Sequence, residues 1–225
     1  MDNKIMKIGT MIVAGIIGIF VLINLFNRYQ EYQTDQENSQ LTAEKSEVLK
    51  LLEKDQVRGD RDAPNTIIVY SDFQCPYCVK FHKTMLEVMD VYPKKVKWIY
   101  RHFPLSSHQF SNQAAIATEA AALQNKFWEF SDKMMENSKA DGAGIREEDI
   151  LRYAVDLGLD IDRFKTDLES KETSSKVEAD IASALELGVS GTPQSYLIDK
   201  NGKIKALNGA LTFQLMKIDI DGTPR

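Results

Sequence analysis

Two cysteines separated by two residues are the clearest chemical feature of this sequence. Cys75 and Cys78 enclose Pro76 and Tyr77, and they are the only cysteines among the 225 residues. Two thiols at this spacing can close a small disulfide, and backbone amides at the start of a helix favour a thiolate over a thiol. The spacing therefore predicts a redox-active dithiol that exchanges electrons with the cysteines of other proteins.

A cysteine pair has two other common uses. The same spacing supplies half of many zinc or iron–sulfur sites, but no second cysteine pair exists, and His82, His102 and His108 lack finger-type spacing. The pair could also be two small buried apolar side chains, as cysteines often are. Pro76 at the first position of a helix, directly after a strand, argues against that use. We expect no metal ion at the pair.

Apolar periodicity indicates a strand before the cysteines and a helix after them. Residues 66–70 are β-branched or aromatic, as in a buried strand. Apolar residues recur at helical spacing over 79–89 until Pro93 stops them, and residues 96–101 alternate as a second strand. This order predicts two parallel strands joined by the helix. Cys75 then lies at the strand-to-helix junction.

The second half of the chain begins with a long helical region. The length of residues 107–188 suggests a helical subdomain inserted into the sheet domain. Residues 194–198 and 204–207 then flank an Asn-Gly hairpin signal, and a closing helix starts at about Thr212. An antiparallel hairpin beside parallel strands gives a mixed sheet, so the expected class is α/β with a mixed central sheet.

The amino-terminal segment determines the expected compartment. Residues 8–26 are 19 uncharged residues, which as a helix reach close to 30 Å and cross a bilayer's hydrocarbon core. A cleaved signal peptide is the alternative, but its apolar region is usually shorter, and no small-x-small cleavage site follows. We expect a single uncleaved transmembrane helix with residues 1–7 in the cytoplasm, because lysines precede the span and acidic residues follow it.

Composition limits the organisation of the remaining chain. Residues 27–55 start as a polar stalk and continue into a short amphipathic helix between 41 and 54, which could pack on the globular part or extend the stalk. Hydrophobic residues make up 43% of the chain, enough for one domain over 56–225. The net charge of −5, without a lysine-arginine cluster, excludes nucleic acid as a partner.

An ordered set of motifs over about residues 56–220 resembles a known family. The motifs are Asp72-Phe73-Gln74-Cys75-Pro76-Tyr77-Cys78, Arg101-His102-Phe103-Pro104-Leu105, Lys126-Phe127-Trp128 and Val189-Ser190-Gly191-Thr192-Pro193. Together they resemble the DsbA-type thiol-disulfide oxidoreductases of thioredoxin fold, and most of all the membrane-anchored, BdbD-like group of Gram-positive bacteria. The resemblance implies a thioredoxin fold with a helical domain inserted at about 107–188.

Thiolate chemistry predicts different roles for the two cysteines. We expect Cys75, at the helix terminus, to have a pKa lowered into the range of roughly 3.5 to 7.5, and Cys78 to be its buried partner. A substrate thiolate would attack the Cys75–Cys78 disulfide at Cys75, and a second substrate thiolate would resolve the mixed disulfide. Pro76 and Tyr77 would tune the thiolate and the surface that a substrate meets. No bound organic cofactor is needed beside the redox-active disulfide.

The resemblance also assigns residues outside the cysteine motif. It implies that Pro193 is cis and packs against the disulfide, while the backbone of Thr192 pairs with an extended substrate. Many relatives carry a buried glutamate six residues before the first cysteine, where this chain has Val69, so the carboxylate expected to manage protons is missing. His82 is more typical of a solvated helix residue, and His102 of a packed strand-end residue, than of a proton donor.

The resemblance implies an activity and its partners. The expected activity introduces disulfide bonds into unfolded or reduced secreted and cell-surface proteins, on the extracytoplasmic face of the cell membrane. A DsbB-like membrane protein would reoxidise the enzyme, and residues 8–26 would hold it in the lipid bilayer. Two alternatives stay open: a disulfide reductase or isomerase that uses the same residues, and a tethered peptide-binding or chaperone-like protein in which the cysteines are incidental.

Overall fold

The part of the chain that the structure describes covers most of the expected globular domain. The computed structural model describes residues 26, 28 and 44–222, and the contacts below lie within 48–222. Apart from the two single residues, the expected cytoplasmic terminus (1–7), membrane anchor (8–26) and first part of the stalk lie outside the described residues. Within that described part, no helix has both the length and the apolar character of a membrane span.

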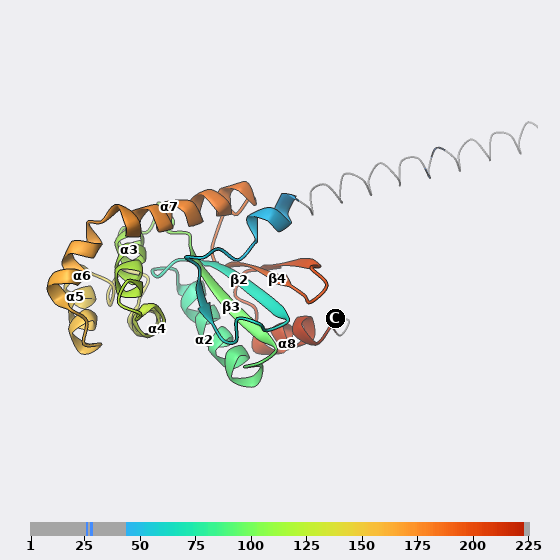
Figure 1. The fold of residues 1–225 in the computed structure, drawn as a ribbon, viewed down its shortest axis with the longest axis horizontal. Coiled ribbons are helices and arrows are strands. Elements are labelled where there is room, and N and C mark those ends of the chain that lie inside the picture. Colours follow the sequence, from blue (N-terminus) through green and yellow to red (C-terminus); the bar gives the residue numbers. More distant parts are fainter. Residues whose placement is uncertain (1–25, 27, 29–43, 223–225) are drawn as a thin grey trace, which may run out of the picture. The chain divides into compact units, whose positions relative to one another are not determined.

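A mixed five-stranded sheet lies at the centre of the domain (Figure 1). Its strands are β1 (Gln56–Arg58), β2 (Asn65–Ser71), β3 (Val96–His102), β4 (Gln194–Ile198) and β5 (Ile204–Asn208). Their order in space is β1-β3-β2-β4-β5; β2 and β3 run parallel, and the other neighbouring pairs are antiparallel. The mixed sheet and the parallel pair are therefore confirmed. The sequence does not predict β1, because three residues are too short to show alternation.

Within the described residues, seven helices connect the strands or follow them. Helix α2 (Pro76–Val91) connects β2 to β3. Between β3 and β4 the chain forms α3 (Ser111–Ala122), α4 (Phe127–Asn137), α5 (Glu147–Asp156), α6 (Ile161–Leu168) and α7 (Lys171–Glu186). Helix α8 (Phe213–Asp221) follows β5. The helices from α3 to α7 thus occupy the stretch of chain between the two halves of the sheet.

Helices pack on both faces of the sheet, because neighbouring residues of a strand point to opposite faces. Ile67 and Val69 of β2 belong to the core beneath α2 and α8, whereas Ile68 and Tyr70 belong to the core beneath α7. Figure 1 shows α2 and α8 on one side of the strands and α7 on the other. Strand β2 is therefore buried on both faces, which explains its uninterrupted apolar sequence.

The segment before β1 packs on the globular domain. Residues 44–48 are helical and residues 49–54 are not, so the expected short amphipathic helix is shorter than predicted. Leu49 is 3% exposed and lies in the core beneath α7. Of the two placements that the sequence left open, the structure shows packing on the domain for the chain after residue 48.

A buried arginine fastens this segment to β3. Arg101 is fully buried, and its guanidinium donates to both carboxylate oxygens of Asp55 at 2.9 and 3.3 Å. It also donates to the carbonyls of Val48 and Lys50 and to the hydroxyl of Tyr70, at 2.7–3.1 Å. All five N–H donors of a guanidinium can be matched in this way. The charge of Arg101 is therefore paired and hydrogen-bonded, as a buried charge requires.

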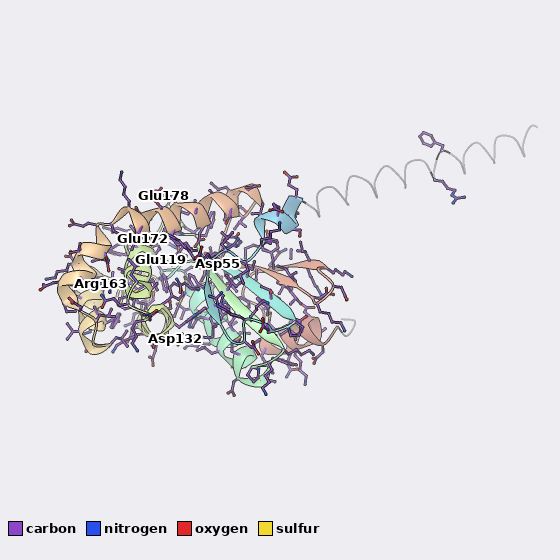
Figure 2. The ribbon with its side chains drawn as sticks, viewed as in Figure 1. Asp55, Glu119, Asp132, Arg163, Glu172 and Glu178 are labelled. Carbon is purple, nitrogen blue, oxygen red and sulfur yellow. The ribbon has the colours of Figure 1, made fainter. Side chains whose placement is uncertain are left out.

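Further charged groups extend the cluster toward α3 and α7. The Lys176 ammonium lies 2.6 Å from Asp180 and 3.5 Å from Asp55. The Asp180 carboxylate also accepts from the backbone N–H of His102, whose ring bonds Glu119. Figure 2 shows Asp55 and Glu119 close to the junction of α3, α7 and the sheet. This cluster joins the first described segment, the sheet and the helical region.

Replacing Arg101 should destabilise the whole domain. In Arg101→Met the buried Asp55 carboxylate loses its main partner, so we expect the free energy of unfolding to fall by about 3–5 kcal/mol. Chemical denaturation measures this loss. The control is Lys54→Met, which breaks an ion pair with Glu172 whose side chains are 64% and 55% exposed, and which should cost less than about 1 kcal/mol. Equal losses in the two variants would contradict the assigned role of Arg101.

Candidate active site

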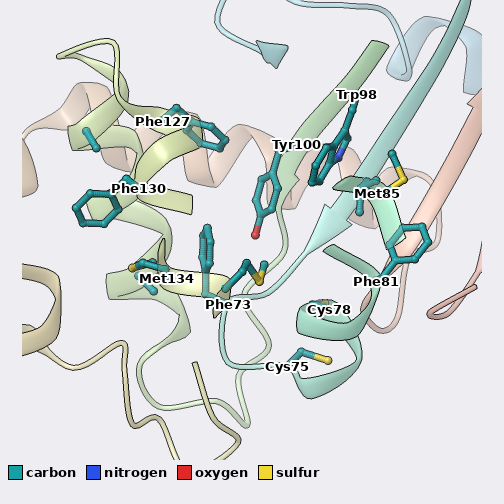
Figure 3. Packing of buried hydrophobic residues seen from close by; sticks show 14 of the residues in the cluster. Phe73, Cys75, Cys78, Phe81, Met85, Trp98, Tyr100, Phe127, Phe130 and Met134 are labelled. Carbon is teal, nitrogen blue, oxygen red and sulfur yellow. The ribbon is translucent and has the colours of Figure 1, made fainter. Parts of the chain in front are cut away.

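The cysteine pair lies at the junction between the end of β2 and the start of α2. Cys75 is the N-cap of α2 with extended backbone angles (φ −77°, ψ 119°), and Pro76 occupies the first turn. Proline fits there because its missing N–H would have no partner in the helix. Both cysteines are free thiols and both are buried, with Cys75 4% and Cys78 1% exposed. The local sequence thus places two sulfurs at the start of one helix (Figure 3).

Cys75 is the thiol that ionises. Its pKa is lowered from 9.0 to about 5, chiefly by the hydrogen bond from the Cys78 thiol, while burial opposes the shift. The Thr192 hydroxyl and the backbone amides of Tyr77 and Cys78 lower the pKa further. As a thiol, Cys75 also reaches the Thr192 carbonyl, with Sγ 3.4 Å from the oxygen. At neutral pH the thiolate therefore predominates.

Cys78 remains a thiol for a complementary reason. Burial raises its pKa well above 9.0, and the neighbouring Cys75 raises it further. The backbone N–H of Asp72 donates to Cys78 Sγ at 3.4 Å. One sulfur therefore carries charge and the other carries the proton that stabilises it. The pair can form a disulfide by losing two electrons and the remaining proton.

The loop that carries the cysteines is tied to the helical region. Phe73 stacks on Tyr100 with ring centroids 5.3 Å apart, and the Ser138 hydroxyl donates to the Phe73 carbonyl. The Gln74 side chain accepts from the backbone of Phe110 and donates to the carbonyl of Ala140, at 3.0 and 3.1 Å. Figure 3 shows Phe73 between the cysteines and the aromatic side chains of the core. These bonds hold in place the loop that precedes Cys75 and the start of α2.

The structure brings the other predicted site residues to the same place. The Thr192–Pro193 peptide bond is cis, and the Thr192 carbonyl faces Cys75 as described above. The Thr192 hydroxyl is buried and has no hydrogen-bond partner at ordinary distance among the described residues, but it is near enough to Cys75 to lower the pKa of that thiol. Tyr77, between the cysteines, is 66% exposed and is free to meet another protein. Pro76 is exposed as well, and both residues lie in the first turn of α2.

His82 is not a solvated residue, contrary to the sequence-based expectation. It is 4% exposed, and its Nε2 lies 2.8 Å from the Asp132 carboxylate of α4. Burial lowers the pKa of His82, although Asp132 opposes this, so the ring is neutral at pH 7. Arg58 bonds the same carboxylate at 2.6 Å and lies over the Trp128 ring at 4.4 Å. His82 thus joins α2 to α4.

The remaining histidines also have protein partners. His102 is a packed strand-end residue, as expected, and its Nε2 lies 2.9 Å from Glu119. His108 Nδ1 lies 2.7 Å from the Asp72 carboxylate. Among the residues that the structure describes, no group of three or more His, Cys, Asp or Glu side chains is arranged to hold a metal ion.

Sequence reasoning missed Asp72 and Ser71 as parts of the site. Both are buried at the end of β2, and Ser71 lowers the pKa of Cys78 by hydrogen bonding. The available signal was a polar pair placed between an apolar strand and a cysteine motif, where a buried polar group needs partners. The sequence does not reveal most partners of Asp72, since Leu105, His108 and Ser111 come from segments after β3.

A family comparison and solved structures identify the fold. The family model described as Thioredoxin matches residues 51–211. The alpha-DsbA1 structure of Wolbachia pipientis has a TM-score of 0.68 at 23% identity, covering 79% of this chain and 94% of that one. Oxidised BdbD of Bacillus subtilis has a TM-score of 0.66 at 22% identity, covering 75% and 91%. The chain therefore has a thioredoxin-like fold with DsbA-like structural neighbours.

Curated relatives match one segment of longer proteins. The Na(+)/H(+) antiporter NhaA 3 of Salinispora tropica is 36% identical over 167 residues, which cover 71% of this chain and 24% of that protein. The antiporter NhaA 1 of Salinispora arenicola is 35% identical over 168 residues, with the same coverage. The chain thus spans about a quarter of the length of these curated relatives.

Titration of the reduced protein tests the division of charge between the sulfurs. We expect thiolate ultraviolet absorbance to appear with a midpoint near pH 5, the pKa of Cys75. Cys78→Ala removes the thiol donor and should raise the midpoint by about one to two pH units, the size of a hydrogen bond to a charged group. Cys75→Ser should show no thiolate in this range. A wild-type midpoint near pH 9 would contradict the assignment.

The same shift predicts a pH-dependent stability of the reduced protein. Because the folded-state pKa of Cys75 is below its ordinary value of 9.0, the thiolate stabilises the fold fully above pH 9. The stabilisation is lost as the pH falls through about 5. Relative to Cys75→Ser, the free energy of unfolding should rise with pH in this window by at most about 1.4 kcal/mol per unit. Parallel stability curves for the two proteins would rule out the shift.

Proposed function

The chain belongs to the thioredoxin family, and we propose that it is a thiol-disulfide oxidoreductase that introduces disulfide bonds into secreted or cell-surface proteins. One observation carries this proposal: a thiolate-forming Cys75, with a pKa of about 5, lies beside a protonated Cys78 at the start of α2. A thiolate is the reactive form in disulfide exchange. Stabilising it stabilises the reduced enzyme, which makes the oxidised enzyme a better oxidant.

The proposed reaction is two successive exchanges. A substrate thiolate attacks Cys75 Sγ of the oxidised enzyme, forming a substrate–Cys75 bond and releasing Cys78 as the leaving sulfur. A second substrate thiolate then attacks the substrate sulfur of this mixed disulfide and releases the Cys75 thiolate. The substrate loses two electrons and the enzyme dithiol gains them. The low pKa of Cys75 favours its departure in the second step.

Several features would serve substrate binding. The Tyr77 ring, next to the cysteines, is exposed, and the Thr192 carbonyl lies 3.4 Å from Cys75 Sγ. An extended substrate that pairs with the backbone of Thr192, beside Pro193, would bring its cysteine to this sulfur. Backbone pairing suits substrates of unrelated sequence, because it does not depend on their side chains.

We place this activity at the outer face of the cell membrane. The uncharged residues 8–26 support a membrane anchor with residues 1–7 in the cytoplasm. An oxidising compartment suits disulfide formation. Each turnover leaves the enzyme reduced, so a DsbB-like membrane protein would reoxidise Cys75 and Cys78, and an anchor would keep both partners in one bilayer.

Oxidative refolding tests the proposed function. The oxidised full-length protein in detergent micelles should restore activity to a reduced, unfolded disulfide-containing protein, because it can accept the substrate's electrons. Cys75→Ser should lose this activity. Cys78→Ser cannot form the internal disulfide and should lose the activity as well. When it is offered a protein that already contains a disulfide, its Cys75 thiolate should attack that bond and accumulate as a mixed disulfide, since no internal thiol can release the substrate.

Two results would favour the alternatives. Activity that requires a reduced enzyme, together with a Cys75–Cys78 potential near −270 mV, as in thioredoxin, would favour a reductase or isomerase; a value near −120 mV, as in DsbA, would favour an oxidase. Refolding activity that survives Cys75→Ala would favour a tethered peptide-binding or chaperone-like protein.

A further inference from the structure

Asp72 is a buried carboxylate beside the cysteines that the proposed reaction does not use. It is 1% exposed, and four donors converge on it. Oδ1 accepts from the backbone N–H of Gln74 at 2.7 Å and from the Ser111 hydroxyl. Oδ2 accepts from the backbone N–H of Leu105 at 2.8 Å and from His108 Nδ1 at 2.7 Å. Because backbone N–H groups can only donate, the carboxylate serves both oxygens as acceptors, and it fixes the His108 tautomer with hydrogen on Nδ1.

These four bonds hold the active-site loop to a distant part of the chain. Gln74 lies in the same loop, whereas Leu105 and His108 follow β3 and Ser111 begins α3. The backbone N–H of Phe103 adds a bond to the carbonyl of Ser71 at 2.9 Å. The loop therefore cannot shift without breaking bonds to the segment that leads from the sheet into the helical region.

The backbone of Asp72 contacts both cysteines. Its N–H donates to Cys78 Sγ at 3.4 Å, and its carbonyl accepts from the N–H of Cys75 at 3.2 Å. The side chain and the backbone of one residue thus do different things. The carboxylate anchors the loop, and the anchored amide is aimed at the buried sulfur.

Charge develops on that sulfur during the proposed reaction. When an external thiolate attacks Cys75 Sγ, the Cys75–Cys78 bond breaks and its electron pair leaves on Cys78 Sγ. Cys78 is 1% exposed, so water does not solvate the departing thiolate. A fixed N–H donor stabilises charge where it develops, at no cost of reorganisation.

We propose that Asp72 is a positioning residue whose anchored backbone N–H stabilises the Cys78 thiolate as it leaves the disulfide. This inference rests on the proposed function and adds to it the group that serves the leaving sulfur. It predicts an asymmetry. Asp72 should matter when Cys78 is the leaving group, and it should not matter when the Cys75 thiolate attacks an external disulfide, because Cys78 Sγ gains no charge in that step.

Asp72→Asn tests this asymmetry in the full-length protein in detergent micelles. The amide keeps the size of the side chain but replaces one acceptor oxygen with an NH₂ donor, which leaves a backbone N–H without its acceptor. We expect the rate constant for attack of glutathione thiolate on the oxidised enzyme to fall at least tenfold. The rate constant for attack of the reduced enzyme's Cys75 on an aromatic disulfide should change less than twofold.

A matched carboxylate elsewhere provides the control. Asp149 also accepts from a loop N–H, that of Gly144 at 3.0 Å, and bonds Arg152, but it lies in α5 away from the cysteines. Asp149→Asn should leave both rate constants unchanged. If Asp72→Asn does not fold, Ser111→Ala removes one of the four donors and should show a smaller drop with the same asymmetry.

Two outcomes would overturn the proposal. Equal losses in both reactions would mean that Asp72 only maintains the fold of the site. Unchanged rate constants in both would mean that the hydrogen bonds of Asp72 do not affect the departure of the Cys78 thiolate. Neither outcome affects the proposed function, which depends on loss of oxidative refolding in Cys75→Ser. Failure of the two ideas can therefore be told apart.

Discussion

Two sulfur atoms share one buried site, and only one of them can carry charge. The hydrogen bond from the Cys78 thiol is the largest cause of the low pKa of Cys75, and burial together with Cys75 keeps Cys78 protonated. Each sulfur therefore sets the state of the other. The start of α2, the Thr192 loop and the apolar core hold this pair away from water. In water both thiols would have similar pKa values, whereas in this site the two values differ. The chemistry of the site follows from that inequality.

Buried polar groups keep the pair in place, and most of their partners come from outside the sheet. Asp72 binds the segment between β3 and α3, and Gln74 binds residues before α3 and after α4. At the opposite side of the sheet, Arg101 fastens the chain near Asp55 to β3. The helical region thus helps to define the geometry of the cysteines as well as adding a surface. Such groups are costly when unpaired, so each specifies one arrangement of the loops around it.

The sequence predicts those features that depend on neighbouring residues. Apolar runs give β2, β3 and α2, and the spacing of Cys75 and Cys78 indicates their chemistry. Long-range pairings are different: His82 was wrongly expected to be solvated because Asp132 lies 50 residues away in the chain. Strand β1 is defined by its pairing with β3 and by little in its own three residues. The roles proposed for Pro76, Tyr77, Thr192 and Pro193 remain predictions, because geometry shows proximity and activity needs measurement.

The low pKa of Cys75 also bears on the direction of electron flow. Compared with a thioredoxin thiol of pKa about 7, a thiol of pKa about 5 is more stable as a thiolate at pH 7, which stabilises the reduced pair and raises its potential above that of thioredoxin. Structural disulfides of secreted proteins lie below about −300 mV, so a pair whose potential exceeds the thioredoxin value of about −270 mV can still form them. A DsbA-like potential is therefore not needed for oxidation, and the supply of an oxidising partner decides whether the site works as an oxidase.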